Sequence, residues 1–320
     1  MTAYDIFNGD ADGICALLQL RQAAPRTSRL ITGVKRDIAL IERQDYAAGD
    51  QLCVLDISLD KNRTGLQRAL AAGAEVLYFD HHFAGQIPYS PRLETHIDTG
   101  GDICTSLLVD RYLGGRGRAW AVVGTFGDNL HRVARRLAQP LQLNAAQLAQ
   151  LQNLGTYINY NSYGAKVADL HFAPAALYRK LLPHTDPLAF IAEDADSFAR
   201  IEQGYRQDLA QAATVEADYC SASLAVFRLP DAAWARRVSG VYGNQLARAT
   251  PERAHLVLTE KPDGSYLVSA RAPLDRKTGA DEICRQFPTG GGRQAAAGID
   301  SLPAERLGEL IQKMENYYAA

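Results

Sequence analysis

Acidic side chains follow short apolar runs at several places in the first 130 residues, and a pair of histidines joins one of them. The acidic residues are Asp10, Asp12, Asp56, Asp80 and Asp128, and the pair is His81 and His82. Carboxylates that gather in one place repel one another unless cations lie between them. An oxygen-rich set with some imidazole suits Mn²⁺ better than Ca²⁺, with Mg²⁺ as the alternative. The pattern therefore predicts a divalent metal site.

The elements that must bring these residues together alternate between strand and helix. We expect strands at Ala3–Phe7, Leu30–Val34, Leu52–Ile57 and Glu75–Phe79, and helices at Ile14–Ala23 and Thr64–Ala72. Strands that alternate with helices pair in parallel, in a sheet covered by helices on both faces. Ligands of such a sheet collect beyond the carboxyl ends of its strands, where the acidic residues fall. We count Asp128 with them, because it follows the apolar stretch Trp120–Phe126.

Each of these residues, taken alone, has an ordinary structural explanation. An aspartate after a strand commonly caps the next helix, which would account for Asp10 or Asp56. Asp128 before Asn129 is typical of a loop, and a chance pair of histidines is not rare. The metal-site prediction depends on their joint occurrence at one edge of one sheet.

The remainder of the chain changes character twice. Residues 144 to 215 are mostly helical in pattern, with a predicted turn at 159–164. Strand-like runs follow after Cys220, with a hairpin signal at Lys261-Pro262-Asp263-Gly264. We predict an α/β protein with a parallel-sheet domain at 1–140, a helical linker at 141–216 and a smaller α/β domain at 217–320.

A glycine-rich segment near the end of the chain is the second feature with chemistry. It contains Gly290, Gly291, Gly292 and Arg293. Three glycines allow close approach of the backbone to a ligand, and their amides can converge on an anion. The Arg293 guanidinium adds a planar donor suited to phosphate. The alternative is a flexible turn before a helix of small residues.

At these positions the chain resembles the DHH phosphoesterase superfamily. That superfamily includes RecJ-type exonucleases, nanoRNases that degrade very short RNA, cyclic-dinucleotide phosphodiesterases and family II inorganic pyrophosphatases. The matching motifs, in order, are Asp10-Ala11-Asp12-Gly13, Asp56, Asp80-His81-His82 and Asp128. The glycine-rich segment lies where the DHHA1 substrate domain carries Gly-Gly-Gly-His, and Arg271 matches the arginine that precedes it. The resemblance covers nearly the whole chain and is least specific over the middle helices.

The resemblance implies roles for these residues around two divalent ions. Asp56 would bridge the ions, Asp10 would bind the first, and Asp12, His81 and Asp128 would bind the second. His82 would face the phosphate, while Asp80 would orient the histidines or reach a metal itself. The ions would activate a water and hold the attacking and leaving oxygens in line.

The chain departs from the family pattern in two places. Family members commonly carry a His four residues before the first motif aspartate or an Asp two before it, where this chain has Ile6 and Asn8. Asn8 offers only an amide oxygen, so we assign it as a tentative ligand and expect the first metal to be held more weakly. Arg293 stands where the family has His, which suggests preference for a terminal phosphate.

These features predict a metal-dependent phosphodiesterase, a hydrolase, that cuts short oligonucleotides or linear dinucleotides such as pGpG to mononucleotides. Activity as a 3′-phosphoadenosine 5′-phosphate phosphatase is a related option, and a pyrophosphatase fits the glycine-rich segment less well. The alternatives are a RecJ-like single-strand exonuclease and a non-catalytic nucleotide-binding regulator whose metal site has eroded, which Ile6 and Asn8 favour.

Composition bounds the setting of this activity. The 320 residues carry 34 Lys and Arg against 36 Asp and Glu, so we expect no extended basic surface for long nucleic acid. Five scattered cysteines without a CxxC pair indicate reduced thiols. Because no apolar run reaches the length of a membrane span and no secretory signal is recognisable, we expect a cytoplasmic protein with no membrane partner. A second copy of the chain, in a homodimer, is a candidate partner.

Overall fold

The computed structural model describes residues 1–319 and divides the chain into two units. The first runs from Met1 to Gln203 and the second begins at Gly204. The boundary falls within helix α9 (Ala195–Ala212), which starts in the first unit. The three-part division at 140 and 216 stays a prediction.

A parallel five-stranded sheet forms the centre of the first unit. Its strands are β1 (Ala3–Phe7), β2 (Arg29–Ile31), β3 (Gln51–Leu55), β4 (Glu75–Asp80) and β5 (Leu93–Ile97). Their order in the sheet is β2-β1-β3-β4-β5, and all pairs are parallel. The chain adds β2 on one side of β1 and then β3, β4 and β5 on the other side. This change in the order of strands, a topological switch point, opens a crevice at the carboxyl ends of β1 and β3.

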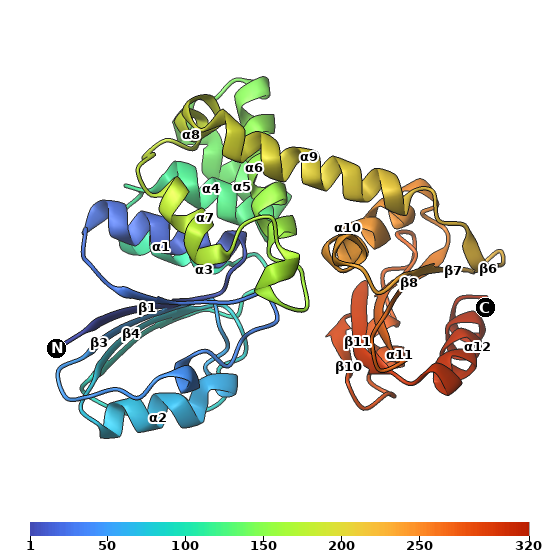
Figure 1. The fold of residues 1–320 in the computed structure, drawn as a ribbon, viewed down its shortest axis with the longest axis horizontal. Helices are drawn as coiled ribbons and strands as arrows, with labels where there is room; N and C mark the ends of the chain where they lie inside the picture. The colour runs from blue at the N-terminus through green and yellow to red at the C-terminus, as the bar shows by residue number, and fades with distance from the viewer. Residues whose placement is uncertain (320) are drawn as a thin grey trace. The chain divides into compact units, whose positions relative to one another are not determined.

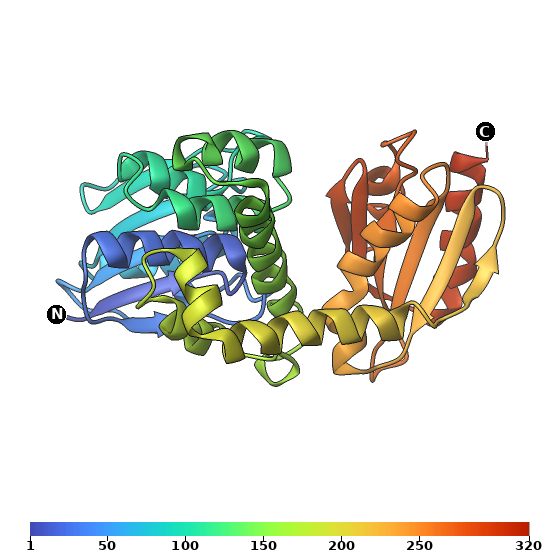
Figure 2. The ribbon, with the colours of Figure 1, turned by 90° about the horizontal axis from the view of Figure 1, so that it is seen from above.

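Helices cover both faces of this sheet, as the sequence predicts. Helix α1 (Ala11–Ala23) lies along one face and α2 (Arg63–Ala71) lies on the other (Figures 1 and 2). The α2 face is packed with apolar side chains, among them Ile6, Val54 and Tyr78. Burial of apolar area contributes about 25 cal/mol per Å² to the stability of the sheet. It also fixes the register of the strands, because a shift by one residue would turn these side chains to the opposite face.

The other helices of the first unit lie on the same side as α1 (Figure 1). They are α3 (Thr105–Tyr112), α4 (Arg118–Gly127), α5 (His131–Ala138), α6 (Ala145–Asn161), α7 (Pro174–Leu181) and α8 (Pro187–Glu193). Pro174 and Pro187 are the first residues of α7 and α8, where the missing amide hydrogen costs nothing.

Three local predictions for the first unit were wrong. The apolar stretch Trp120–Phe126 belongs to helix α4, so Asp128 follows a helix and not a strand. The predicted turn at 159–164 begins too early, because α6 continues through Asn161. Helix α1 starts at Ala11 and not at Ile14, since Asp10 caps it.

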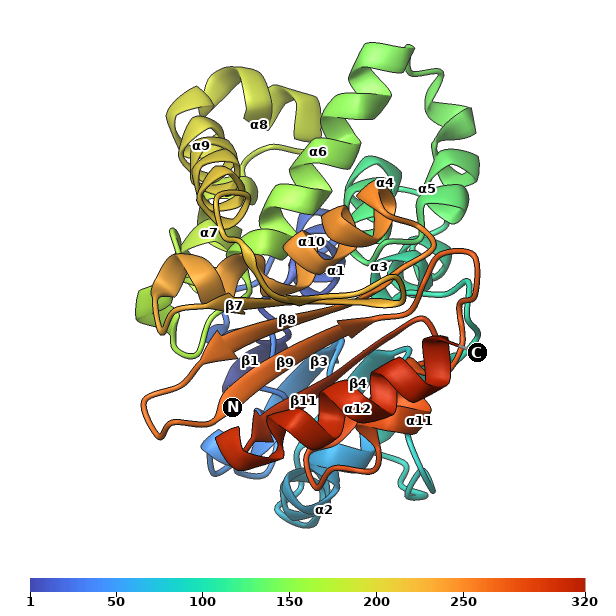
Figure 3. The ribbon, with the colours of Figure 1, turned by 90° about the vertical axis from the view of Figure 1, so that its right-hand side faces the viewer.

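The second unit is a mixed six-stranded sheet between helices (Figure 3). Its strands are β6 (Ala217–Cys220), β7 (Leu224–Leu229), β8 (Ala254–Glu260), β9 (Tyr266–Arg271), β10 (Gly290–Arg293) and β11 (Ala296–Leu302). Their order is β10-β11-β9-β8-β7-β6. The predicted hairpin joins β8 to β9 in antiparallel register. Helix α10 (Ala233–Ala249) covers one face, and α11 (Ala280–Cys284) and α12 (Leu307–Tyr318) cover the other.

Two further sequence expectations can be compared with the described residues. Within 1–319, none of the helices is long and apolar enough to cross a bilayer. The five cysteines are free thiols, and only Cys220 is exposed.

Candidate metal centre

The loop between β1 and α1 carries the first two aspartates. Asp10 is the N-cap of α1, with its Oδ1 accepting the Gly13 amide at 3.1 Å. Gly13 is required here because a Cβ atom would lie 2.3 Å from the Asn8 carbonyl oxygen. The capping role expected of a lone aspartate is therefore confirmed, and one oxygen of Asp10 is engaged by the helix.

Asp12 lies in the first turn of α1 and is clamped by helix α3. Its Oδ2 accepts the Thr105 amide and its Oδ1 accepts the Ser106 amide, each at 2.7 Å. The first amides of a helix have no partner within it and carry partial positive charge. Helix α3 therefore orients this buried carboxylate and offsets part of its charge.

Asp56 closes β3 in a left-handed backbone conformation, with φ of 61°. The Asp56 amide donates to the carbonyl of Phe79, and its Oδ1 accepts the Thr105 hydroxyl at 3.0 Å. Non-glycine residues rarely adopt this conformation, although Asp and Asn do so more readily than others. Its side chain is 2% exposed.

The two histidines after β4 have different surroundings. The His81 Nδ1 lies 2.9 Å from the carbonyl oxygen of Ile103, so it must carry the proton, and the Nε2 lies 3.4 Å from Asp56 Oδ1. The His82 Nδ1 lies 2.7 Å from Asp80 Oδ1, and its side chain is 45% exposed. His81 thus presents a ring nitrogen to the carboxylates, while buried Asp80 holds His82 at the surface.

Asp128 approaches the same carboxylates from the end of α4. Burial and the Asp12 charge raise its pKa to about 6. Its Oδ2 is buried and has no hydrogen-bond partner among residues 1–319, and the same is true of Asp80 Oδ2. A buried carboxylate oxygen without a partner is costly, and beside other carboxylates it is a candidate ligand for a cation.

The pKa shifts of Asp56 and His81 also indicate an excess of negative charge in this cluster. Burial, with the neighbouring Asp10 and Asp12 charges, raises the pKa of Asp56 well above its usual value. Burial would lower the pKa of His81, but the Asp56 carboxylate outweighs it and raises that pKa to about 10. Without an external cation, the cluster must therefore retain protons to lower its negative charge.

Lys35, which sequence reasoning missed, lies inside this acidic cluster. Its Nζ donates to Asp10 Oδ2 and, at 3.0 Å, to Asn159 Oδ1. Burial would raise the pKa of Asp10, but the Lys35 ammonium outweighs it and lowers that pKa to about 2. Lys35 follows the predicted strand Leu30–Val34, so the strand-end rule that selected the aspartates would have found it had it been applied to basic residues.

Asn8 is buried beside Lys35 and is engaged by backbone groups. Its Oδ1 accepts the Asp10 amide at 3.3 Å, and its Nδ2 donates to the Lys35 carbonyl oxygen at 3.3 Å. The amide oxygen that we assign as a tentative ligand thus already has a donor. The ligand role of Asn8 stays a prediction.

The donor set around Asp56 and His81 fits a divalent cation. One atom from each of Asp56, His81 and His82 lies within 4.8 Å of the others. Asp12 lies beside them, with 4.0 Å between its Oδ2 and His81 Nε2. Carboxylate oxygens with one imidazole nitrogen are ligands that Mn²⁺ accepts. The observed arrangement therefore supports divalent metal binding.

In the second unit, the glycine-rich segment is a strand. Residues 290–293 form β10, which pairs antiparallel with β11, so the small residues that follow are a strand and not a helix. Gly290 and Gly292 are tightly packed, since added Cβ atoms would lie 1.7 Å from the Cys284 carbonyl oxygen and 2.4 Å from Ala297 Cα. Gly291 has open space around it, and the Arg293 side chain is exposed. Gly292 and Arg293 are the exposed members of this segment, and Gly291 is partly exposed, so these three are the ones that a ligand can reach.

Arg271, by contrast, is held by its own unit. Its guanidinium donates to Asn244 Oδ1 at 2.6 Å, to Ser269 Oγ at 3.0 Å and to the Gly240 carbonyl oxygen at 2.9 Å. These contacts tie β9 to helix α10. The substrate-binding role of Arg271 stays a prediction, and the observed contacts favour a role in holding helix α10 against the sheet.

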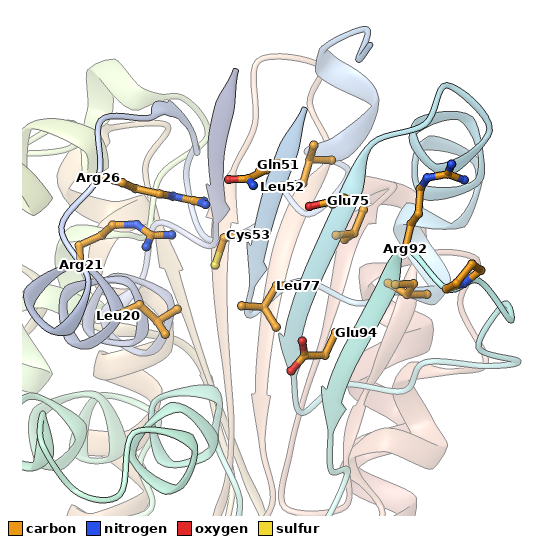
Figure 4. Close-up of a pocket in the computed structure, with 13 residues that line it drawn as sticks. Leu20, Arg21, Arg26, Gln51, Leu52, Cys53, Glu75, Leu77, Arg92 and Glu94 are labelled. Carbon is orange, nitrogen blue, oxygen red and sulfur yellow. The ribbon is translucent and has the colours of Figure 1, made fainter. Parts of the chain in front are cut away.

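A cavity of about 410 Å³ lies at the opposite, amino-terminal edge of the first sheet (Figure 4). Arg21, Arg26, Cys53, Glu75 and Glu94 line it, and none of the residues assigned to the metal centre does. Arg21 and Arg26 bind the buried Asp5 carboxylate, which gives these two a structural role. The cavity is therefore separate from the metal centre.

Comparisons with known proteins reveal similarity of fold. No protein-family model and no curated protein sequence matches the chain. A crystal structure of exonuclease RecJ bound to manganese matches with a TM-score of 0.61 at 18% identity, over 99% of this chain and 90% of that one. The DHH domain of a protein described as a member of the s1p family of ribosomal proteins matches with a TM-score of 0.67 at 12% identity, over 99% of this chain and 86% of that one. A pGpG-specific phosphodiesterase, PggH from Vibrio cholerae, matches with a TM-score of 0.57 at 13% identity, over 100% of this chain and 99% of that one.

Proposed function

We propose that this chain, which has the fold of the DHH/DHHA1 phosphoesterases, is a divalent-metal-dependent phosphodiesterase of short oligonucleotides or linear dinucleotides. The observation that carries the proposal is the convergence of Asp12, Asp56, His81 and Asp128 at the switch point of the sheet, with a buried and unpartnered oxygen on Asp128. The expected products are mononucleotides.

The chain's own residues would hold and orient the reacting groups. Asp12, Asp56, His81 and Asp128 would hold the metal, with Asp12 locked by the α3 amides and His81 by the Ile103 carbonyl. A bound divalent ion supplies a nucleophilic water and charge neutralisation at the phosphate. Mn²⁺ is our first choice of metal, since the similar RecJ structure is bound to manganese.

His82 is the residue best placed to act on the phosphate. Its Nδ1 is tied to Asp80 Oδ1 at 2.7 Å, so its Nε2 is the ring nitrogen available to a ligand. When protonated, that nitrogen can donate to a phosphate oxygen or to the leaving oxygen as charge develops there. Asp80 would stabilise the imidazolium that this role requires.

Three observations support a short substrate. The overall charge is close to neutral, whereas long polymers usually need an extended basic surface. The glycine-rich segment of the second unit places an exposed arginine, Arg293, beside glycines with little side-chain bulk, an arrangement suited to a phosphate. One of the similar folds belongs to a pGpG-specific phosphodiesterase. A 5′-phosphorylated dinucleotide such as pGpG is therefore our preferred substrate.

The test is a panel of substrates given to the purified chain with Mn²⁺. It contains 5′-phosphorylated dinucleotides, long single strands, cyclic dinucleotides, 3′-phosphoadenosine 5′-phosphate and pyrophosphate. We expect the fastest release of mononucleotide from dinucleotides, and its loss in Asp56→Ala and His81→Ala. Equal or faster processive digestion of long strands would indicate a RecJ-like exonuclease instead. Nucleotide binding without turnover of any substrate would indicate a regulator.

A further inference from the structure

The carboxylate of Asp10 already has a partner at each oxygen. Oδ1 accepts the Gly13 amide and Oδ2 accepts the Lys35 ammonium. The family resemblance assigns a divalent ion to this carboxylate. In this chain, the second oxygen of that carboxylate is bound by a protein cation.

Lys35 is held in this position from several directions. Beyond its bond to Asn159, its ammonium lies 5.6 Å from the centre of the Tyr163 ring, a cation–π distance. Its backbone amide donates to the Ser162 carbonyl at 2.9 Å, and its own carbonyl accepts from Asn8 Nδ2. A surface lysine normally samples many rotamers, whereas this one has a defined cradle formed by the β1–α1 loop and the end of α6.

We propose that the Lys35 ammonium replaces the first divalent ion, so that the centre binds a single divalent ion per chain. That ion would lie on the side of Asp12, Asp56, His81 and Asp128. The inference rests on the proposed function only in taking this cluster as a metal centre. It changes the number of ions from the two that the resemblance implies to one.

Neighbouring residues support the replacement. Ile6 and Asn8 stand where the family commonly supplies a histidine or an aspartate, so neither position adds a charged ligand beside Asp10. Ile6 is fully buried in the apolar core, and the Asn8 oxygen is used by the Asp10 amide. A dication brought to Asp10 would also be repelled by the ammonium at close range. The Asp128 side, in contrast, keeps an unpartnered buried oxygen within the described chain.

The test counts bound Mn²⁺ by equilibrium dialysis and elemental analysis of the purified full chain. We expect about one ion in the wild type, about two in Lys35→Met at high Mn²⁺, and about one in Lys35→Arg, which keeps the charge. Lys61→Met, at an exposed lysine of the same unit, is the matched control and should bind one. Electron paramagnetic resonance gives an independent readout, since a single Mn²⁺ shows the hyperfine pattern of an isolated ion and a close pair shows exchange coupling.

Two exchange-coupled ions in the wild type would overturn the replacement while leaving the proposed function intact. A Lys35→Met variant that folds and still binds one ion would also overturn it. Wild type that binds no Mn²⁺ would overturn both the inference and the proposed metal-dependent function.

Discussion

The first sheet buries carboxylates in the middle of strand β1 and at the carboxyl ends of its strands, and their surroundings differ in opposite ways. Asp5, on β1, is fully buried, and its oxygens accept from Arg21, Arg26 and Ser28 at 2.6 to 2.8 Å. Burial would raise the pKa of Asp5, but the Arg21 guanidinium outweighs it and lowers that pKa. Asp56, at the carboxyl end of β3, has carboxylates as neighbours, and its pKa is raised.

This contrast separates a structural carboxylate from a ligand carboxylate. Where the chain supplies enough cations and hydrogen-bond donors of its own, the charge of the buried carboxylate is neutralised and the carboxylate has a structural role. Where the chain supplies too few, the deficit can be met by protons or by an external cation. Lys35 makes Asp10 an intermediate case, since it lies at the metal edge but has a protein cation as Asp5 does.

The largest expected effect comes from Asp56→Asn. Removing this charge should abolish Mn²⁺ binding and reduce hydrolysis to background, because Asp56 lies between the other carboxylates and His81. The metal-free protein should be no less stable than the wild type, since a repelled buried carboxylate is lost. Thermal unfolding with and without Mn²⁺ measures both expectations.

Asp60→Asn is the control for Asp56→Asn, because Asp60 lies just beyond the same strand and pairs only with Arg63 among the described residues. Mn²⁺ should raise the unfolding temperature of the control but not that of Asp56→Asn. An equal Mn²⁺-induced rise in both would contradict the assignment of Asp56 as a ligand.

Asp5→Asn should have the opposite signature. It leaves the Arg21 guanidinium buried without its counter-charge, which costs about 3 kcal/mol of unfolding free energy. Mn²⁺ affinity of the folded protein should be unchanged. Urea denaturation of the full chain, followed by a signal from the first unit, gives the free energy, with Glu94→Gln as the control at an exposed carboxylate of the same sheet. A loss below about 1 kcal/mol would place Asp5 with ordinary surface ion pairs.

His82→Ala should lower kcat by about 10²-fold, the usual range for loss of one proton-transferring group. Mn²⁺ binding should be retained, because Asp80 and not the metal holds the His82 ring. Steady-state kinetics beside dialysis separate the two effects. If the variant lost Mn²⁺ as well, His82 would be a ligand and its catalytic assignment would be wrong.

The smallest effect concerns acid stability. The pKa of Asp5 is lowered from 3.8 in the folded protein, so its stabilisation is fully present above the unfolded value. It is lost as the pH falls through the lower folded value. Below about pH 4, wild type should therefore lose unfolding free energy more steeply than Asp5→Asn. Parallel denaturation curves for the two proteins would show that Asp5 is not the group responsible.

Much of the first sheet could be predicted from the sequence because local pattern and tertiary role agree there. Ala3–Phe7 is a strand with the predicted bounds, and the aspartates after β1 and β3 lie at the switch point. The stretch before Asp128 was misplaced because a fully buried helix and a buried strand share the same apolar composition.

The parts of the centre that were missed lie far along the chain from the motifs they serve. Thr105 and Ser106 act on Asp12 through backbone amides, which carry no residue-specific signal. Lys35 resembles any surface lysine until Asn159 and Tyr163, more than 120 residues later, enclose it. Contacts of that kind arise only when helix α6 packs on the domain.

The left-handed turn at Asp56 limits which residues this position can accept. Glutamate carries the same functional group, yet it would pay about 1 kcal/mol in backbone strain and shift the carboxylate by one methylene. Asparagine and glycine suit the turn but bring no charge. The need for a charged ligand and the left-handed backbone together favour aspartate at this position. A homologue that lost the activity could therefore replace Asp56 with asparagine or glycine and keep the same fold.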